Sequence, residues 1–520
     1  MTFYVCFYSL LYKIMRFFYK VYFLNINNTF LKRNVSNELL TRNCKSFHCI
    51  PGPLSLPGIG TLYQYFPVIG QYRFDTLHLN GFKKYQKFGP VVREQIVPDV
   101  NILWLFDPSD IETMFRHEGK YPQRRSHLAL EKYRLDRPNV YNSGGLLPTN
   151  GPEWFRIRSV LQKGLSSPQA VKRFLKGSDQ IIQEWIEFIG QPPKKHRNDY
   201  LPEISRLFLE LTGYSMLDIR LDSFSYHEHQ KHSRTSRLIK AAYVTNSCIL
   251  KTDNGPQLWR KFETPLYRKL RKSQEYMEDV AIDLLSLKMS LFKERDKYTP
   301  LTLLETYLSS PELDFKDIIG VICDFLLAGI DTTTYTTSFL LYHLAINPEI
   351  QHKAYEESLK LLKTPQSAVT EDVLKEAVYT KAVLKESLRL RPVSVGIGRI
   401  LQNEAVFSTY PVPAETVVVS QNQISCRLDK YFECADKFSP DRWIKGHPLY
   451  KQAHPFLLLP FGHGPRSCIA RRLAEQNMVI LTLKVVRNYK IEWAGGTLDS
   501  RSLLINKPDG PILLTFKKRE

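Results

Sequence analysis

Residues 461–470 of this 520-residue chain read FGHGPRSCIA, and the apolar helical pattern RRLAEQNMVILTLKVV follows directly. This glycine-rich loop places Cys468 immediately before the start of a helix. Backbone N–H groups and the positive end of a helix both favour a thiolate at such a position. A cysteine placed in this way can act as a nucleophile or as a metal ligand. No His/Asn partner pattern typical of a cysteine protease accompanies it.

The remaining cysteines indicate that Cys468 acts alone. None of the eight cysteines in the chain is spaced as Cys-x-x-Cys, which argues against a zinc ribbon and against a redox dithiol. Eight cysteines are also too few for a disulfide framework in a chain of 520 residues. The cysteine content therefore favours a reducing compartment.

The overall composition is that of a folded globular protein. The chain is 43% hydrophobic and 24% charged, and its mean hydropathy of -0.28 excludes a polytopic membrane protein. Its net charge of +20 is compatible with nucleic acid, an anionic membrane surface or an acidic protein as partner. Charge alone does not distinguish these three classes.

Most of the chain between residues 50 and 520 has helical patterns, with few strands. Residues 88–106 predict two short strands around a turn, and residues 393–420 predict a second β-rich stretch with its turn near Tyr410-Pro411. Segregated helices and strands of this kind predict a mostly-α (α+β) single domain.

One predicted helix covers residues 315–346 and ends where Asn347-Pro348 stops it. It is apolar on nearly all sides, so we expect it to cross the core. Ala328, Gly329 and Thr332 share one face in its middle, where small side chains leave room for a flat group. A helix–helix contact that requires small residues is the alternative explanation.

The N-terminal segment, residues 1–49, differs from the rest of the chain. Residues 1–50 contain seven basic residues and one acidic residue, Glu38. Its opening apolar run is shorter than the roughly 20 residues that a spanning helix needs, and no small-residue cleavage site follows it. An acid-poor, basic and amphipathic segment predicts an organelle transit peptide. A short helix resting on a membrane is the alternative.

The loop at 461–470 resembles the haem-binding signature of cytochrome P-450 monooxygenases, Phe-x-x-Gly-x-Arg-x-Cys-x-Gly. The signature positions are occupied by Phe461, Gly464, Arg466 and Cys468, while Ala470 replaces the final glycine. The methyl group of Ala470 would affect how closely the backbone approaches the haem. It would not affect ligation of the iron by Cys468.

Four further segments resemble motifs of the same family, in the family's order. They are Trp154 with Arg158 of the C helix, residues 328–333 of the long I helix, Glu386 with Arg389 of the K helix, and residues 438–443, which include Arg442. Together the matches extend over residues 50–520. The resemblance implies the cytochrome P-450 fold: a single large, mostly α domain with small β-sheets and a long central I helix over the haem.

The resemblance also implies how a haem b cofactor would be held. The Cys468 thiolate would be the proximal iron ligand, and electron donation from sulfur favours cleavage of the O–O bond of O2. Haem propionates buried without partners would be very costly, so cationic and N–H groups should meet them. The family positions for cofactor binding are Trp154, Arg158, Arg399, Phe461, Arg466 and Cys468.

Two residues of the I-helix motif would take part in catalysis. Oxygen activation consumes two protons, which the Asp331 carboxylate and the Thr332 hydroxyl would deliver through water. Glu386, Arg389 and Arg442 would instead form a buried charge network that holds the fold without a chemical step.

Basic residues indicate the electron donor. Lys381 and Lys385 lie one turn apart on the K helix, and Arg471 and Arg472 directly follow the haem loop. Mitochondrial members of the family carry basic residues at matching positions and accept electrons from an acidic, adrenodoxin-like ferredoxin, which a ferredoxin reductase supplies from NADPH. Solvated lysines and a charged helix start are the alternative explanation.

Within the mitochondrial group the sequence is most similar to insect ecdysteroid 22-hydroxylases. The similarity implies a small hydrophobic steroid substrate, and the insertion of one oxygen atom from O2 at C22 of an ecdysteroid precursor in moulting-hormone synthesis. The substrate pocket should draw on residues 124–147 and 321–332. The expected location is the matrix side of the inner mitochondrial membrane, with peripheral membrane association.

Other functions would leave different signatures. A non-catalytic haem-thiolate protein would share Cys468 but would not need Asp331 and Thr332. A nucleic-acid binder would explain the net charge, yet no recognition motif is visible and the charge is spread along the chain. A microsomal monooxygenase of another lipid or xenobiotic, on the endoplasmic reticulum membrane, would need a spanning helix at residues 1–20.

Overall fold

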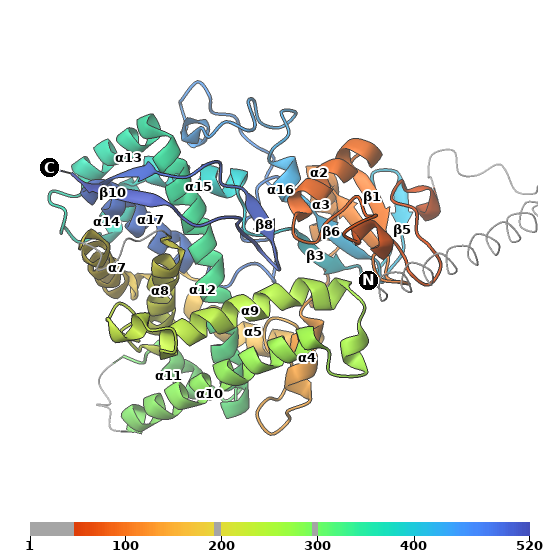
Figure 1. The fold of residues 1–520 in the computed structure, drawn as a ribbon, viewed down its shortest axis with the longest axis horizontal. Coiled ribbons are helices and arrows are strands. Elements are labelled where there is room, and N and C mark those ends of the chain that lie inside the picture. Colours follow the sequence, from red (N-terminus) through yellow and green to blue (C-terminus); the bar gives the residue numbers. More distant parts are fainter. Residues whose placement is uncertain (1–45, 192–198, 294–299, 520) are drawn as a thin grey trace, which may run out of the picture. The chain divides into compact units, whose positions relative to one another are not determined.

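The long apolar stretch of the sequence forms helix α12, Phe315–Ile346, at the centre of the body (Figure 1). These bounds confirm the helix predicted from the sequence. The computed structural model describes residues 46–191, 199–293 and 300–519. The expected transit segment, residues 1–49, lies outside the described residues except for its last four. From Ser46 onward the chain clusters as one compact unit.

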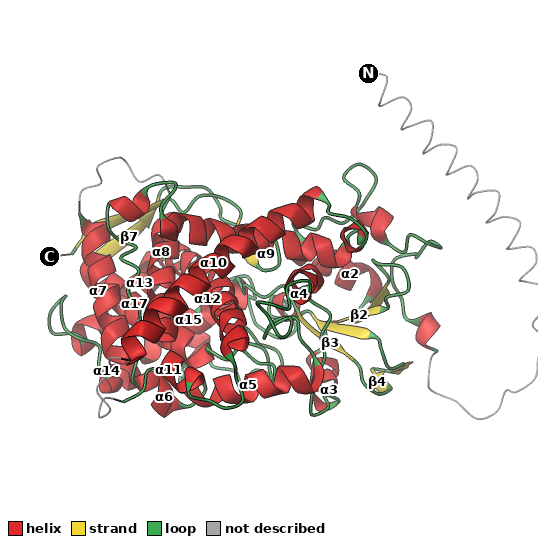
Figure 2. Cartoon of the chain, turned by 90° about the horizontal axis from the view of Figure 1, so that it is seen from below, coloured by secondary structure: helices red, strands yellow, loops and turns green. Residues whose placement is uncertain are grey.

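Helices dominate the described residues, which confirms the mostly-α (α+β) fold class (Figure 2). The helices are α2 (Leu77–Phe88), α3 (Pro108–Arg116), α4 (Leu128–Leu135), α5 (Gly151–Leu165), α6 (Pro168–Lys172), α7 (Leu175–Gly190), α8 (Leu201–Thr212), α9 (Arg234–Asn254), α10 (Pro265–Lys293), α11 (Leu303–Leu308), α12, α13 (Pro348–Leu361), α14 (Glu371–Glu376), α15 (Val378–Leu390), α16 (Asn422–Ser425) and α17 (Arg471–Asn488).

In the described residues the strands form one four-stranded sheet and three antiparallel two-stranded pairs. They are β1 (Val91–Glu94), β2 (Ile102–Leu105), β3 (Ile397–Ile400), β4 (Ala405–Phe407), β5 (Tyr410–Val412), β6 (Val417–Ser420), β7 (Tyr489–Trp493), β8 (Ser500–Ser502), β9 (Asn506–Pro508) and β10 (Leu514–Lys518). The two-stranded pairs are β4-β5, β8-β9 and β7-β10. The larger sheet has the order β1-β2-β6-β3, in which β2 and β6 pair in parallel with Leu103 opposite Val418. Figure 2 shows this sheet beside α2, at one end of the helical body.

Both β-rich stretches predicted from the sequence are present, and the second contains the predicted turn. Tyr410 and Pro411 lie within β5, and the chain turns at Ser408, whose φ is +54°. The turn predicted near Tyr410-Pro411 is therefore present, and it lies directly before these residues, at residues 408–409. The Asp110 carboxylate accepts hydrogen bonds from the Ser408 N–H at 2.6 Å and from its hydroxyl at 2.7 Å, which holds the turn in place. Pro411 is tolerated because a two-stranded pair leaves one side of β5 free.

The core lies on both sides of α12. Residues of its first half, such as Ile322, pack with α5, α9 and α10, whereas residues of its second half, such as Phe339, pack with α7, α8 and α17. Within the described residues, α12 alone is long and apolar enough to span a membrane, and 78% of its most apolar window is buried in the protein. This burial is what a central core helix requires.

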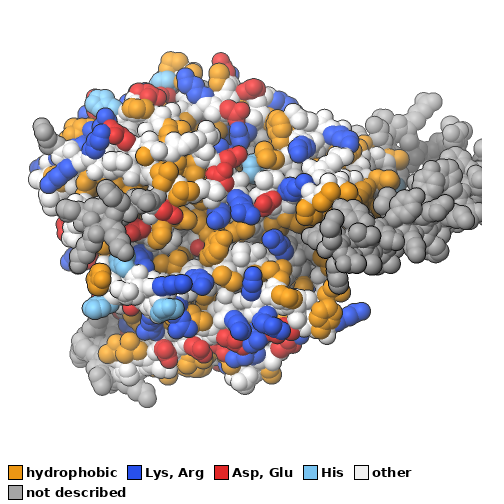
Figure 3. All heavy atoms as spheres, in the orientation of Figure 1, with side chains coloured by type: hydrophobic (Ala, Val, Ile, Leu, Met, Phe, Trp, Pro, Cys, Tyr) orange, Lys and Arg blue, Asp and Glu red, His pale blue; other side chains and the backbone are white. Residues whose placement is uncertain are grey.

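The surface has charges of both signs. On the face drawn in Figure 3, Lys and Arg side chains are interspersed with Asp and Glu rather than gathered into one stripe. Exposed apolar side chains occur near the start of the described body, at Leu54, Phe66, Val68 and Ile69. The connection between α9 and α10 exposes two more, Leu258 and Phe262.

Candidate active site

The loop that carries Cys468 is held by backbone geometry that favours glycine. Gly462 and Gly464 have φ values of +74° and +73°, in the left-handed region. A Cβ atom on Gly464 would also lie 2.5 Å from Oε2 of Glu118. The loop closes where the Cys468 N–H donates to the Phe461 carbonyl at 2.8 Å. Two glycines therefore allow the chain to fold back and deliver the thiol at the start of α17.

Cys468 lies within the protein but opens onto an internal cavity. Burial raises the pKa of its thiol, while the Ala470 N–H and the nearby Arg158 guanidinium act in the opposite direction. The described residues contain no group of three or more His, Cys, Asp or Glu side chains that could hold a metal ion. A metal at Cys468 would therefore need its other ligands from a cofactor.

Ala470, the departure from the family signature, is accommodated without strain. Its φ of -97° and ψ of 17° are accessible to any residue, so the final glycine of the signature is not required here for backbone conformation. Ala470 lines the cavity together with Cys468. Its methyl group is part of the cavity wall.

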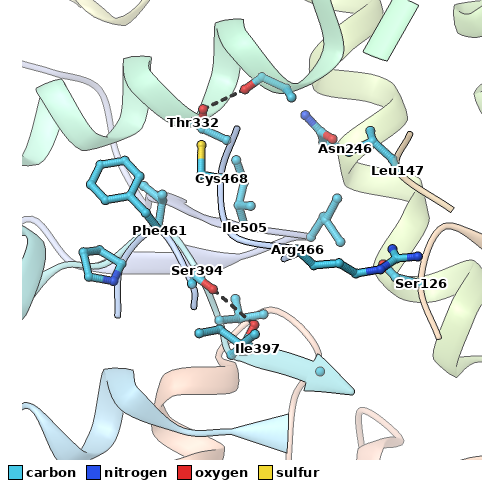
Figure 4. A pocket seen from close by; sticks show the side chains of 18 of the residues that line it. Ser126, Leu147, Asn246, Thr332, Ser394, Ile397, Phe461, Arg466, Cys468 and Ile505 are labelled. Atoms are coloured by element: carbon cyan, nitrogen blue, oxygen red, sulfur yellow. Dashed lines mark hydrogen bonds between the residues drawn. The ribbon is translucent and has the colours of Figure 1, made fainter. Parts of the chain in front are cut away.

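The cavity lies between the Cys468 loop, α12 and the β2-β6-β3 face of the sheet, and has a volume of about 570 Å³. Figure 4 shows Cys468 and Thr332 near one another, with Ser126 on the far side of the pocket. Ala328, Gly329 and Thr332 all face this cavity. A Cβ on Gly329 would lie 2.6 Å from the Thr212 hydroxyl oxygen of α8, so the helix–helix explanation also holds. The small residues of α12 serve both purposes.

Four buried or half-buried arginines gather beside the Cys468 loop. Arg399 and Arg466 line the cavity, as does Arg124, which the sequence did not single out. Arg466 donates to the Pro122 carbonyl at 2.6 Å, and its guanidinium lies 4.2 Å from the centre of the Trp154 ring. Trp154 and Arg158 are not among the residues that line the cavity, and they support it from behind.

Each of these arginines is fixed by carbonyl or carboxylate groups. Arg158 donates to the Ser467 carbonyl at 2.9 Å, and Arg124 donates through Nε to the Leu147 carbonyl at 3.0 Å. Arg399 pairs with Glu118 at 2.5 Å, and both side chains are 5% exposed. Burial lowers the pKa of all four guanidinium groups; it lowers that of Arg466 to about 8, with the other three arginines contributing.

Asp331 and Thr332 are adjacent in sequence but face different surroundings. Thr332 lines the cavity, and its hydroxyl donates to the Ala328 carbonyl at 2.7 Å. Asp331 does not line the cavity. It is buried in the protein, where its Oδ2 accepts a hydrogen bond from Asn246 Nδ2 of α9 at 2.8 Å. Asn246 itself lines the cavity. Burial raises the pKa of Asp331 to about 6, although Asn246 and Tyr335 oppose the shift.

Glu386, Arg389 and Arg442 form a closed network away from the cavity. Arg389 Nη2 and Arg442 Nε donate to Oε1 of Glu386 at 2.8 and 3.0 Å, and Trp443 Nε1 donates to its Oε2 at 2.9 Å. Arg389 also donates to the carbonyls of Cys426 and Ala435. The side chains of Glu386 and Arg389 are fully buried. Both arginines share the one carboxylate of Glu386, so removal of Glu386 would leave two buried positive charges without an ionic partner.

The four basic residues expected at a docking surface are exposed. Lys381 and Lys385 face solvent on α15, and Arg471 and Arg472 face solvent at the start of α17. Lys385 Nζ lies 4.0 Å from the centre of the Trp443 ring, and the nearby Arg471 charge contributes to lowering the Lys385 pKa, after burial. Arg471 pairs with Glu475 at 3.2 Å, and Arg472 donates to the Ser166 carbonyl.

Comparisons with known proteins agree with this geometry. The family profile described as "Cytochrome P450" matches residues 50–515. The chain belongs to the cytochrome P450 family. It is 48% identical over 485 residues to "Cytochrome P450 302a1, mitochondrial" of Drosophila melanogaster, covering 92% of this chain and 97% of that protein. It is 28% identical to "Ecdysone 20-monooxygenase" of the same organism, covering 95% of this chain and 94% of that protein.

A third relative from Drosophila melanogaster, "Probable cytochrome P450 301a1, mitochondrial", is 28% identical over 91% of this chain and 87% of its own length. The P450 described here is therefore a monooxygenase of the mitochondrial type, as the sequence predicted. The family implies a haem cofactor, so the cavity should offer groups whose charge complements that of haem.

The residues fit an anionic cofactor. Of the four arginines, Arg399 alone is hydrogen-bonded to a carboxylate among the described residues, so three positive charges there are unmatched. Nη1 of Arg466 is buried without a hydrogen-bond partner. Two haem propionates would bring two negative charges to this group, whereas the charge of a Cys468 thiolate would be offset by the net positive charge of a ferric porphyrin. The positive charge of the site therefore has the sign that the propionates require.

Sequence reasoning missed three residues of this site. Arg124 lies beside Arg125 in a stretch that has the pattern of a solvated surface, and Glu118 follows Arg116 and His117 in a similar one. Asn246 lies on α9 without any motif around it. All three reach the site through contacts between segments far apart in the chain, for which a single sequence offers no local signal.

Proposed function

We propose that this P450 inserts one oxygen atom from O2 at C22 of an ecdysteroid precursor. The monooxygenase part of the proposal is carried by one observation: Cys468 and Thr332 line the same cavity and lie near one another in it. The steroid part is supported by the resemblance to ecdysteroid 22-hydroxylases and by similarity to a relative named ecdysone 20-monooxygenase. The cavity walls are largely apolar, as a steroid body requires.

The residues around the cavity would divide the work as follows. Haem bound through Cys468 would supply the redox chemistry that activates O2. Arg399 and Arg466 would hold its edge, together with Phe461 from the loop. Trp154 and Arg158 would support these residues from behind, through the Arg466 guanidinium and the Ser467 carbonyl. Arg124 would add a further positive charge at the propionates.

Proton supply would come from α12. The Thr332 hydroxyl is positioned in the cavity, where it can hold a water molecule or pass on a proton. The pKa of Asp331, about 6, suits a group that accepts and releases protons near neutral pH. Because Asp331 is reached through Asn246, we propose that protons pass from Asp331 to the cavity beside Asn246.

The electron donor would be an acidic ferredoxin, reduced by a ferredoxin reductase from NADPH. Its proposed docking surface consists of Lys381, Lys385, Arg471 and Arg472. Arg471 and Arg472 begin the helix that Cys468 precedes, which places positive charge next to the ligand side of the site. Complementary charge mainly raises the association rate, and salt screens it over about 8 Å at physiological ionic strength.

Charge reversal tests this surface. Lys381→Glu combined with Lys385→Glu should raise the ferredoxin concentration for half-maximal turnover and should leave the haem spectrum unchanged. Reversal of Lys83 and Lys87 on α2, beside the sheet, is the matched control and should have little effect. Efficient turnover with a microsomal diflavin reductase, and no change on reversal, would refute both the docking surface and the ferredoxin partner.

The proposed location is the matrix side of the inner mitochondrial membrane, with peripheral attachment. Two relatives that carry "mitochondrial" in their names support the organelle. The exposed apolar side chains Leu54, Val68, Ile69 and Phe262 could enter the lipid surface. In Figure 1 the first described residues, drawn in red beside the sheet, and the C-terminal end of α9 lie at the same end of the body, so one membrane surface would be able to contact both segments.

A substrate panel tests the central proposal. The holoenzyme is incubated with ferredoxin, its reductase and NADPH, and with ecdysteroid precursors, cholesterol or a fatty acid. Product analysis by mass spectrometry and NMR should show a new hydroxyl at C22 of an ecdysteroid precursor. Oxidation at another carbon, or turnover of the fatty acid alone, would refute the steroid assignment while leaving the monooxygenase intact.

A further inference from the structure

Glu118 is a buried carboxylate beside the arginine group, and no step of the proposed mechanism uses it. It follows α3, and its side chain is 5% exposed. Oε1 accepts a hydrogen bond from Arg399 Nε at 2.5 Å, whereas Oε2 is buried without a partner. Burial raises the pKa of Glu118, and Arg399 and Arg466 counteract this effect. A carboxylate held in this way needs the positive charges around it.

Glu118 and Arg399 together support the Cys468 loop. Arg399 Nη2 donates to the His463 carbonyl at 3.2 Å, and Nη1 donates to the Gly398 carbonyl at 2.9 Å. Glu118 Oε2 lies so close to Gly464 that a Cβ there would be 2.5 Å away. The Arg399 guanidinium is thereby held between Glu118 and the loop while it also lines the cavity. Its direction is set by the carboxylate on one side and the carbonyls on the other.

The charge balance gives Glu118 a second role. Among the groups that act on the Arg466 pKa, Glu118 raises it, whereas burial and the other arginines lower it. Among the described residues, Glu118 is the one carboxylate that is hydrogen-bonded to any of the four arginines, and its partner is Arg399. With two propionates in place, Glu118 would bring the carboxylate charges beside the four arginines to three. Without Glu118, the positive charges there would exceed the negative charges by two.

We propose that Glu118 is a positioning residue for the haem: it directs Arg399 toward the haem edge and supplies a negative charge that offsets part of the excess positive charge of the four arginines. This inference rests on the proposed role of Arg399 at the propionates. Removal of a negative charge near the iron favours the reduced state, which carries one more electron. Glu118 should therefore hold the haem reduction potential below the value it would otherwise have.

Redox titration of the holoenzyme tests the charge role. Glu118→Gln keeps the shape and the acceptor for Arg399 Nε, and should shift the reduction potential to a more positive value while retaining the haem. Arg399→Gln should shift it to a more negative value, and the double variant should return close to the wild type. The proposal is overturned by an unchanged potential in Glu118→Gln, or by a double variant that stays as far from the wild type as either single variant.

Haem release to an acceptor protein tests the positioning role. Glu118→Ala removes the hydrogen bond that fixes Arg399 and should release haem about tenfold faster, the effect of losing one charged hydrogen bond. Asp179→Asn, which neutralises the carboxylate paired with buried Lys484, is the matched control. It should lower thermal stability without changing the potential or the release rate. Equal effects of the two substitutions would reduce Glu118 to a general structural role and overturn the proposal.

These outcomes are separable from failure of the proposed function. Wild-type protein that binds carbon monoxide without the long-wavelength band of a thiolate-ligated haem would refute the function itself. A normal band together with an unchanged potential in Glu118→Gln refutes this inference alone.

Discussion

Replacement of Asp331 by Asn should stabilise the fold at neutral pH although it removes a proposed catalytic group. Burial raises the Asp331 pKa from 3.8 to about 6, so the folded protein binds this proton more tightly than the unfolded chain does. That stabilisation is complete below pH 3.8 and is lost as the pH rises through about 6. At neutral pH the folded protein therefore carries a buried ionised carboxylate at a cost.

The size of the effect follows from the two pKa values. Their difference of about 2 pH units, at about 1.4 kcal/mol per unit, corresponds to about 3 kcal/mol as an upper value. Unfolding entropy of about 2.1 cal/mol/K per residue gives roughly 1 kcal/mol/K for a body of this length. The carboxamide introduced by the substitution can still accept the hydrogen bond from Asn246. Asp331→Asn should thus raise the unfolding temperature by about 3 °C at pH 7.5.

Thermal unfolding of both proteins between pH 5 and pH 8 provides the assay. The difference between the variant and the wild type should shrink as the pH is lowered. Asp499→Asn is the contrasting control, because hydrogen bonding with His78 and the Arg391 charge hold the Asp499 pKa well below its usual range. That variant should lose stability at pH 7.5. If Asp331→Asn is no more stable than the wild type, or if its advantage is the same at every pH, the argument from burial is wrong.

Three other substitutions test the proposed roles directly. Cys468→Ser should abolish the long-wavelength absorption of the reduced carbon monoxide complex, and retention of that band would exclude Cys468 as the iron ligand. Glu386→Ala leaves two buried arginines without their partner at a cost of about 3–5 kcal/mol, so little haem-loaded protein should be recovered; a well-folded, haem-replete but inactive variant would instead make Glu386 catalytic. Thr332→Ala should bind haem and substrate but release more peroxide per NADPH consumed, and unchanged coupling would remove Thr332 from proton delivery.

Local sequence patterns predicted the elements that depend on local forces. The bounds of α12 follow from an unbroken apolar pattern that begins at an Asp314 capping box and ends before Pro348. The strands β1 and β2 follow from short runs of β-branched and aromatic residues. The Cys468 loop was recognisable because its glycines occupy fixed positions.

Features that depend on contacts between distant segments were not predictable. The position of the turn at Ser408 is set by Asp110, nearly three hundred residues earlier in the chain. Glu118 reaches Arg399 in the same way, across 281 positions. Asp331 was recognised by its motif, yet nothing in the motif indicates that its carboxylate is buried with Asn246 and does not line the cavity. The sequence therefore identifies individual groups, while the direction of each side chain depends on the tertiary fold.

The parallel pairing of β2 with β6 has a consequence for how the protein acquires its cofactor. Leu103 and Val418 become neighbours only after most of the chain has been synthesised, and the Cys468 loop follows later still. Closing so long a loop is slow, because its entropy is lost before the contacts that reward it form. A nascent chain that has not yet reached Cys468 lacks the thiol altogether. Cofactor capture must therefore be one of the last events of maturation, and a chain that crosses a membrane in unfolded form would receive its haem only after it arrives.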